Sequence, residues 1–262
     1  MPFFETANGS IHYQLDGPAG APVLVLSNSL GTDLAMWDAQ LPAFTETLQV
    51  LRYDTRGHGK SVVSEGFYSI EELGQDVLAL LDALNIKRAA FCGLSMGGLI
   101  GQWLGVHAEP HIEKLILCNT AAKIGNDEVW NGRIDTVLKG REQAMAELRD
   151  GAVARWFTPD YAAANPQTVE RITQMLAATS PEGYAANCAA VRDADFRGQL
   201  ESISVPTLIV TGAADEVTTT EHGRDMQACI SGAELKEFEA AHLSNVQAGD
   251  AFTRTVLEFL KK

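Results

Sequence analysis

CGLSMGGLIG, residues 92–101, joins a short apolar run to a helical pattern, with a single serine, Ser95, at the junction. Residues 89–92 predict a buried strand, and the apolar spacing after residue 98 predicts one face of a helix. Gly93 and Gly97 flank the serine, as expected for a sharp strand-to-helix turn that has no room for Cβ atoms. This Gly-x-Ser-x-Gly pattern predicts a nucleophile elbow, with Ser95 as the nucleophile.

Glycine also recurs along the predicted helix, although each glycine in a helix interior costs about 1 kcal/mol relative to alanine. Gly97, Gly101 and Gly105 are four residues apart and form a stripe without side chains. We expect the stripe to let the helix approach a sheet closely, and this closer packing would offset the cost.

The chain has 262 residues, of which 46% are hydrophobic, and a net charge of −14. This length allows one large domain or a domain with an insertion. The negative charge disfavours a nucleic-acid partner or an anionic membrane surface. MPFFETANGS (residues 1–10) lacks the basic start and apolar core of a signal peptide, and no apolar run is long enough to span a bilayer. These features predict a soluble, cytoplasmic protein.

Cysteine usage also favours a cytoplasmic protein. The chain shows no Cys-x-x-Cys pair or other metal-ligand spacing, and we expect small, reduced, buried side chains. The four positions are Cys92, Cys118, Cys188 and Cys229.

Short apolar runs alternate with helical patterns over most of the chain. The clearest helix is predicted over 69–84, where Ser69 can cap the first turn. Alternation of this kind predicts an α/β fold, with a mostly parallel central sheet flanked by helices. The predicted strands cover residues 22–26, 50–53, 89–93, 114–118, 206–210 and 234–238.

The alternation fails between about residues 123 and 197, where successive helical patterns are broken at Gly140, Pro159, Pro166 and Pro181. We predict that residues 123–197 form a helical cap (lid) inserted in a core made of residues 1–122 and 198–262. The cap would cover the carboxyl edge of the sheet, where open α/β sheets bind ligands.

A serine at an elbow needs a histidine to take its proton and a carboxylate to orient that histidine. FEAAHLSN (residues 238–245) places His242 after the last predicted strand and before a final helix, which Ser244 or Asn245 would cap. This loop would lie at the same sheet edge as Ser95, so we predict His242 as the base. His58, in the glycine-rich DTRGHGKS (residues 54–61), could border a pocket, but its setting favours a turn residue.

Asp215 follows the strand pattern TLIVTG (residues 207–212), where a triad carboxylate is expected. The next residue, Glu216, is the alternative candidate for the triad carboxylate. Asn119, at the end of an earlier predicted strand, cannot carry the charge. The order Ser95, Asp215, His242 along the chain is the one expected for a fold with a nucleophile elbow.

An oxyanion hole needs two backbone N–H donors. One is expected from Met96, directly after the nucleophile. The other is expected from the loop SNSLGTDLAMW (residues 27–37), because this loop follows the first core strand. Alternatively, the Ser, Asn, Gly and Thr residues of this loop form an ordinary turn.

These residues resemble the α/β-hydrolase superfamily over the full chain. More narrowly, LSNSLGTDLAMWDAQLPAF (26–44), LRYDTRGHGKS (51–61), FCGLSMGGLIGQWLG (91–105), NTAAKIG (119–125) and AAHLSN (240–245) are similar to 3-oxoadipate enol-lactonases. The resemblance implies opening of a small anionic enol-lactone to 3-oxoadipate, in the β-ketoadipate pathway of bacterial aromatic degradation. It also implies a Ser-His-Asp acyl-enzyme mechanism with no metal or organic cofactor. Aligned on Trp37, Asn28-Ser29-Leu30 stands where relatives often have His-Gly-aromatic, which implies the Leu30 N–H as the second oxyanion donor. One departure is DEVTTTEHG (215–223), where relatives often have D-x-V-T-P-P; the loop can be looser, but the aspartate is kept.

VWNGRI (129–134) resembles the family's Trp-x-x-Arg pattern, which implies that Trp130 and Arg133 meet the substrate. In a helix this spacing places both residues on one face. An arginine can bind a carboxylate through two hydrogen bonds, and an anionic substrate needs such a group in a protein of this net charge. From the residues alone, Arg133 could equally pair with Asp135 or Glu128.

Two other functions stay open at this stage. One is a different serine hydrolase, such as a carboxylesterase or a carbon–carbon bond hydrolase. The other is a small-ligand receptor that keeps the triad but turns over poorly.

Overall fold

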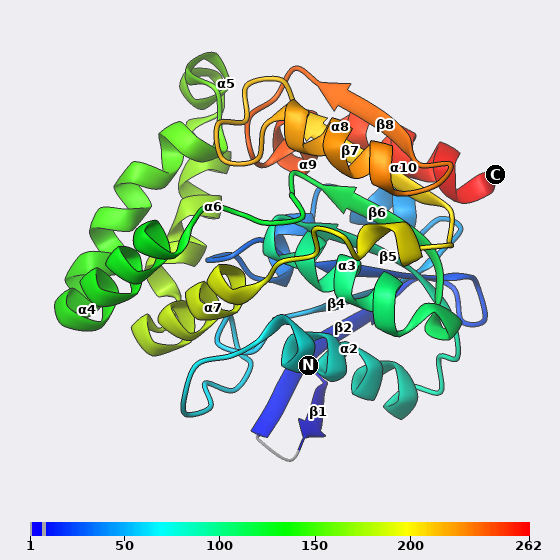
Figure 1. The fold of residues 1–262 in the computed structure, drawn as a ribbon, viewed down its shortest axis with the longest axis horizontal. Helices are drawn as coiled ribbons and strands as arrows, with labels where there is room; N and C mark the ends of the chain where they lie inside the picture. The colour runs from blue at the N-terminus through cyan, green and yellow to red at the C-terminus, as the bar shows by residue number, and fades with distance from the viewer. Residues whose placement is uncertain (1, 7–8) are drawn as a thin grey trace.

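A computed structural model describes residues 2–6 and 9–262, which form an eight-stranded sheet flanked by helices (Figure 1). The strand order is β1-β2-β4-β3-β5-β6-β7-β8. Strands β1 and β2 pair antiparallel, as do β2 and β4, and all other neighbours are parallel. The predicted α/β fold with a mostly parallel sheet is therefore confirmed.

The six predicted strands correspond to β3–β8, and no predicted end differs from the observed one by more than two residues. Two amino-terminal strands, β1 and β2, were not predicted; they form the antiparallel edge of the sheet. The bounds are β1 Phe3–Thr6, β2 Gly9–Asp16, β3 Val23–Ser27, β4 Gln49–Tyr53, β5 Ala89–Leu94, β6 Ile112–Cys118, β7 Thr207–Gly212 and β8 Glu234–Phe238.

Helices cover both faces of the sheet. On one face α3 (Met96–His107) packs against α2 (Ile70–Ala83). The short η3 (Leu200–Ser202) contacts both α3 and α8 (Thr220–Cys229). On the other face α1 (Leu41–Phe44) contacts α10 (Gly249–Lys261). Ser69 caps α2 as predicted, in a capping box with Glu72. Three further short helices are η1 (Leu34–Trp37), η2 (Glu109–His111) and α9 (Ser244–Gln247).

The glycine stripe of α3 lies against the sheet, as predicted. A Cβ on Gly97 would lie 2.4 Å from the Ser27 carbonyl oxygen, and one on Gly105 would lie 2.6 Å from Leu115. Both distances are far inside van der Waals contact. The missing side chains therefore set how closely α3 approaches β3 and β6.

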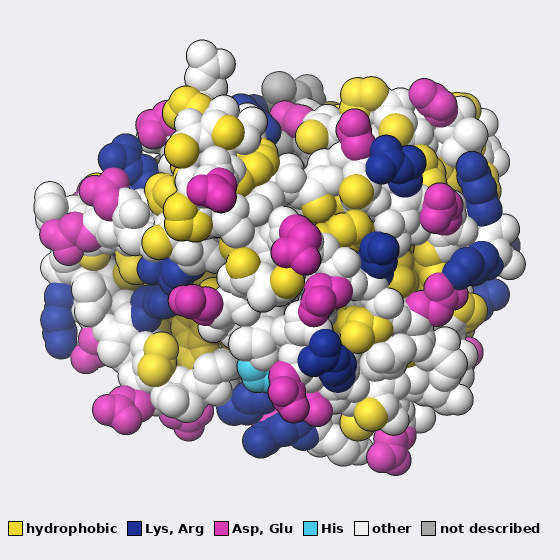
Figure 2. Space-filling model, turned by 90° about the horizontal axis from the view of Figure 1, so that it is seen from above, with side chains coloured by type: hydrophobic (Ala, Val, Ile, Leu, Met, Phe, Trp, Pro, Cys, Tyr) yellow, Lys and Arg dark blue, Asp and Glu magenta, His cyan; other side chains and the backbone are white. Residues whose placement is uncertain are grey.

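Charges of both signs are mixed on one face of the molecule. On the face shown in Figure 2, acidic and basic side chains alternate with small hydrophobic patches. None of the helices in the described part of the chain is long and apolar enough to cross a membrane.

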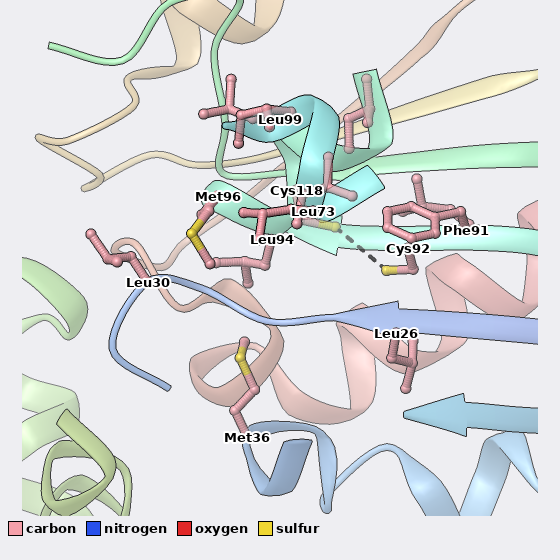
Figure 3. Packing of buried hydrophobic residues seen from close by; sticks show 14 of the residues in the cluster. Leu26, Leu30, Met36, Leu73, Phe91, Cys92, Leu94, Met96, Leu99 and Cys118 are labelled. Atoms are coloured by element: carbon pink, nitrogen blue, oxygen red, sulfur yellow. Dashed lines mark hydrogen bonds between the residues drawn. The ribbon is translucent and has the colours of Figure 1, made fainter. Parts of the chain in front are cut away.

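The core continues from the sheet into the elbow region, where Leu94, Met96 and Leu99 are fully buried (Figure 3). The Sγ atoms of Cys92 and Cys118 lie 3.9 Å apart in this core as free thiols. Cys188 is also free and buried. Cys229 differs from the prediction: it is exposed, at the end of α8.

Between β6 and β7 the chain is helical, and residues 123–197 contain no strand. The helices are α4 (Asp127–Trp156), α5 (Pro159–Ala164), α6 (Pro166–Ala178) and α7 (Pro181–Asp193), and they gather at one end of the sheet (Figure 1). Each predicted proline break is the first residue of a helix. The break at Gly140 is a kink inside α4, where Arg141 takes φ 54° and ψ −133°.

Candidate active site

Ser95 lies at the junction of β5 and α3 with φ 58° and ψ −111°, a conformation that non-glycine residues rarely adopt. A Cβ on Gly93 would lie 2.0 Å from the Gly97 carbonyl oxygen, so the turn excludes any side chain there. Hydrogen bonds hold the strained residue: its N–H donates to Cys118, and Thr120 Oγ1 donates to its carbonyl. The sharp turn thereby fixes the position of Ser95 Oγ.

The structure brings Ser95, His242 and Asp215 together at the carboxyl ends of β5, β8 and β7. Ser95 Oγ lies 2.9 Å from His242 Nε2, and His242 Nδ1 lies 2.8 Å from Asp215 Oδ2. A proton on Nδ1 donates to the carboxylate, which leaves Nε2 free to accept the serine proton. The three predicted residues therefore have the geometry that proton transfer from Ser95 requires.

Asp215 accepts hydrogen bonds on both carboxylate oxygens. Oδ1 accepts from the N–H groups of Val217 and Thr218, and Oδ2 accepts from Thr218 Oγ1 as well as His242. Burial alone would raise the pKa of Asp215, but the nearby His242 charge and the hydrogen bonds outweigh it and lower the pKa to about 2. Glu216, the rival carboxylate, is exposed and forms no such contacts among the described residues.

Asn119, at the end of β6, has a role that its lack of charge did not suggest. Its Nδ2 donates to Asp215 Oδ2 at 2.9 Å and to the Ala241 carbonyl at 3.3 Å, and its Oδ1 accepts from Ser244 Oγ. Asn119 thus joins the loops that carry the acid and the histidine. The predicted helix cap is wrong, because Ser244 and Asn245 lie inside α9 and bond to other elements.

Leu30 and Met96, the predicted oxyanion donors, belong to adjoining segments: the loop after β3 and the first turn of α3 (Figure 3). The Gly97 N–H donates to the Asn28 carbonyl at 3.1 Å and ties these segments together. Neither the Leu30 nor the Met96 N–H donates to another residue in the described chain. Both groups remain available to an oxygen of a ligand.

His58 supports this loop from behind. The Gly31 N–H donates to His58 Nε2 at 2.9 Å, directly after Leu30. Burial lowers the pKa of His58 to about 4, so the imidazole is neutral near pH 7 and can accept this bond. The predicted turn residue therefore also positions the loop that carries Leu30.

A cavity of about 140 Å³ opens above Ser95 and His242. Typical ligand pockets measure roughly 300–1,000 Å³, so this one suits a small molecule. Trp130 and Arg133, which the resemblance implies meet the substrate, line it from α4. Within residues 2–6 and 9–262, no cluster of three His, Cys, Asp or Glu side chains could hold a metal ion.

Arg133 lies with its Cζ 5.0 Å from the centre of the Trp130 ring, and the Trp130 Nε1–H donates to the Ile124 carbonyl at 2.7 Å. Of its two alternative partners, Asp135 is paired with Lys139 at 3.2 Å, and neither Asp135 nor Glu128 forms an ion pair with Arg133. The half-buried guanidinium lines the cavity instead.

Sequence reasoning missed Arg155, which lines the same cavity. Arg133 and Arg155 would be about 33 Å apart along a straight helix. They reach one small cavity because α4 folds back at Arg141 (Figure 1). Tyr184, fully buried on α7, completes this end of the cavity. The only sequence signal for the second arginine is the helix break at Gly140.

Comparison with known proteins agrees with this geometry. Residues 22–248 match the family model of the alpha/beta hydrolase fold. The chain is 44% identical to 3-oxoadipate enol-lactonase 2 of Acinetobacter baylyi, covering 97% of this chain and 94% of that protein. It is 41% identical to 3-oxoadipate enol-lactonase 1 of the same organism, covering 96% and 93%. The crystal structure of the enol-lactonase from Burkholderia xenovorans LB400 superposes with a TM-score of 0.97 at 45% identity, and each chain is covered completely.

Proposed function

Because the chain belongs to the alpha/beta hydrolase fold family, and within it to the 3-oxoadipate enol-lactonases, we propose that it hydrolyses 3-oxoadipate enol-lactone to 3-oxoadipate. The observation that carries the proposal is the hydrogen-bonded chain from Ser95 through His242 to Asp215, beside a small cavity that Ser95, His242 and Arg133 all line. The triad supplies ester hydrolysis, and the arginine favours a carboxylate-bearing substrate.

Acylation begins when His242 Nε2 takes the Ser95 proton and Oγ attacks the lactone carbonyl carbon. The Leu30 and Met96 N–H groups stabilise the oxyanion, and loss of one such donor typically lowers kcat by roughly 10²–10³. The ring C–O bond then breaks, and His242 returns the proton to the departing enol oxygen. The enol tautomerises to a ketone, which makes ring opening effectively irreversible.

Deacylation repeats this sequence with water. His242 takes a proton from the water as its oxygen attacks the acyl carbon, and the Ser95 oxygen leaves with that proton. The new carboxylate is released as part of 3-oxoadipate. Throughout, Asp215 accepts a hydrogen bond from the Nδ1–H group of His242 and stabilises the transient imidazolium.

We propose the same division of the chain that the sequence predicts: a cap of residues 123–197 on a core of residues 1–122 and 198–262. The contribution of Trp130, Arg133, Arg155 and Tyr184 to a cavity that also contains Ser95 supports this division. A cytoplasmic location and the absence of nucleic-acid and membrane partners stay predictions from the sequence.

The direct test is turnover of purified enol-lactone, followed by loss of the enol-lactone absorbance, beside turnover of a neutral aryl acetate. We expect a kcat/KM for the lactone that exceeds that of the aryl ester, and loss of both activities in Ser95→Ala. Efficient hydrolysis of the aryl ester with no lactone turnover would instead identify a general carboxylesterase.

A further inference from the structure

We infer that Arg155 is a second specificity-determining residue, which binds the substrate carboxylate together with Arg133 at the cap end of the cavity. This inference rests on the proposed function, because it concerns the carboxylate of the enol-lactone. Arg155 and Arg133 line the same cavity of about 140 Å³, and both side chains are half-buried. No carboxylate of the described chain forms an ion pair with either of them.

Seven other arginines of the described chain lie within 4.0 Å of a carboxylate, whereas Arg88, Arg224 and Arg254 form no ion pair there. Arg56 binds Asp76 and Arg52 binds Asp38, each within 2.7 Å, and the face in Figure 2 mixes both signs. With 34 acidic against 20 basic residues, acceptors are plentiful. Arg133 and Arg155 have no such acceptor, although both line one small cavity.

Placing the two cations together is unfavourable in the unliganded protein. Burial, and then the positive charge of Arg133, lower the pKa of Arg155. Tyr184 opposes this lowering only as the smallest of the three influences on the pKa of Arg155, and the described chain places no carboxylate in an ion pair with either guanidinium. One carboxylate between the guanidiniums would relieve the repulsion. Guanidiniums also match carboxylate geometry, since each can donate two parallel hydrogen bonds.

Arg155 also lies in the last turn of α4, where a cation is favourable next to the helix dipole. That structural role alone would be served equally well by lysine and would not distinguish one substrate from another. The test therefore needs a charge-deleting variant, a charge-keeping variant and two substrates.

The experiment compares Arg155→Met, Arg155→Lys and the control Arg149→Met. Arg149 lies on the same arm of α4, is partly exposed and pairs with Asp150 at 2.8 Å, so its variant removes the same charge outside the cavity. For Arg155→Met we expect kcat/KM on the enol-lactone to fall about ten- to hundredfold, mainly through KM. Hydrolysis of the aryl acetate should change less than about twofold. The kcat/KM of Arg155→Lys on the enol-lactone should lie between that of Arg155→Met and that of the parent protein. The kcat/KM of Arg149→Met should match that of the parent.

A binding measurement separates this inference from the proposed function. Adipate, a six-carbon dicarboxylate, should inhibit aryl acetate hydrolysis competitively, with a Ki that rises at least tenfold in Arg155→Met and in Arg133→Met. If both arginines grip one carboxylate, the effects of the two substitutions on Ki will not be additive. Unchanged Ki and unchanged lactone KM in Arg155→Met would overturn the role of Arg155, whereas absence of lactone turnover in the parent protein would overturn the proposed function.

Discussion

Replacement of Asp215 by asparagine should cost activity through the protonation state of His242. An asparagine at this position has one oxygen, which is best placed where Oδ1 accepts the Val217 and Thr218 N–H groups. Its NH2 group then faces His242 Nδ1, which must become an acceptor. The imidazole proton moves to Nε2, and His242 can no longer take the proton of Ser95.

The size of the effect follows from these contacts. In a related triad the same exchange lowers kcat by about 10⁴, which corresponds to about 5.5 kcal/mol in the barrier. The new NH2 group also meets Asn119 Nδ2, a donor that now lacks its 2.9 Å acceptor. Leaving buried donors unsatisfied typically costs about 1–3 kcal/mol, so the free energy of unfolding should fall by a similar amount.

The assay is kcat on enol-lactone and aryl acetate, with urea unfolding on the same samples. Both substrates should lose activity equally, because the defect lies in the base and not in recognition. Exposed Glu216→Gln is the control and should keep most activity. In Asp215→Asn/Asn119→Asp the position-119 carboxylate would accept from the new amide, so stability should recover. Near-parent kcat in Asp215→Asn together with a large loss in Glu216→Gln would refute the assignment of the acid.

Three further outcomes are expected. Ser95→Ala should fold normally, as judged by circular dichroism, and should hydrolyse neither lactone nor ester; near-parent turnover would exclude Ser95 as nucleophile. Arg133→Met should lower kcat/KM on the lactone by roughly 30- to several-thousand-fold, through loss of about 2–5 kcal/mol, while aryl acetate hydrolysis changes little; equal losses on both substrates would make Arg133 structural. His58 has a pKa of about 4 in the folded protein against 6.5 in the unfolded chain, so the unfolded chain takes up the proton first as the pH falls. The contribution of His58 to the free energy of unfolding is therefore complete above pH 6.5 and declines towards pH 4, by about 3 kcal/mol at most. Urea titrations at pH 7.5 and 4.5 should show a smaller decline in His58→Gln, and identical declines would contradict this assignment.

Much of the core and the triad could be predicted because their signals are local. The buried strands are short apolar runs, and Gly93 and Gly97 mark a turn that only glycine allows. Ser95, Asp215 and His242 each follow a recognisable strand, and parallel strands bring their carboxyl ends to one edge. The edge strands β1 and β2 lack this signal, since one or both of their faces are partly exposed and their apolar residues are interrupted.

The supporting residues could not be predicted because their partners are distant in sequence. Asn119 meets Asp215 across 96 positions, and His58 meets Gly31 across 27. Neither contact leaves a periodic pattern in the chain. Arg155 depends on the direction in which α4 turns at Arg141, and that direction is set by packing against α6 and α7.

The bend in α4 also separates regions that tolerate a change in length from regions that do not. Trp130 and Arg155 stand near the open end of a helical hairpin and Arg133 stands midway along its arm, whereas exposed Arg141 forms the tip and pairs with Glu182. One residue inserted between Arg133 and the tip would rotate that arm by about 100° relative to the bend and turn Arg133 out of the cavity. Insertions of about one full turn in each arm at the tip would keep both arms in phase. Natural or designed variation in this segment should therefore accumulate at the tip, in steps of three or four residues, with the substrate pocket unchanged.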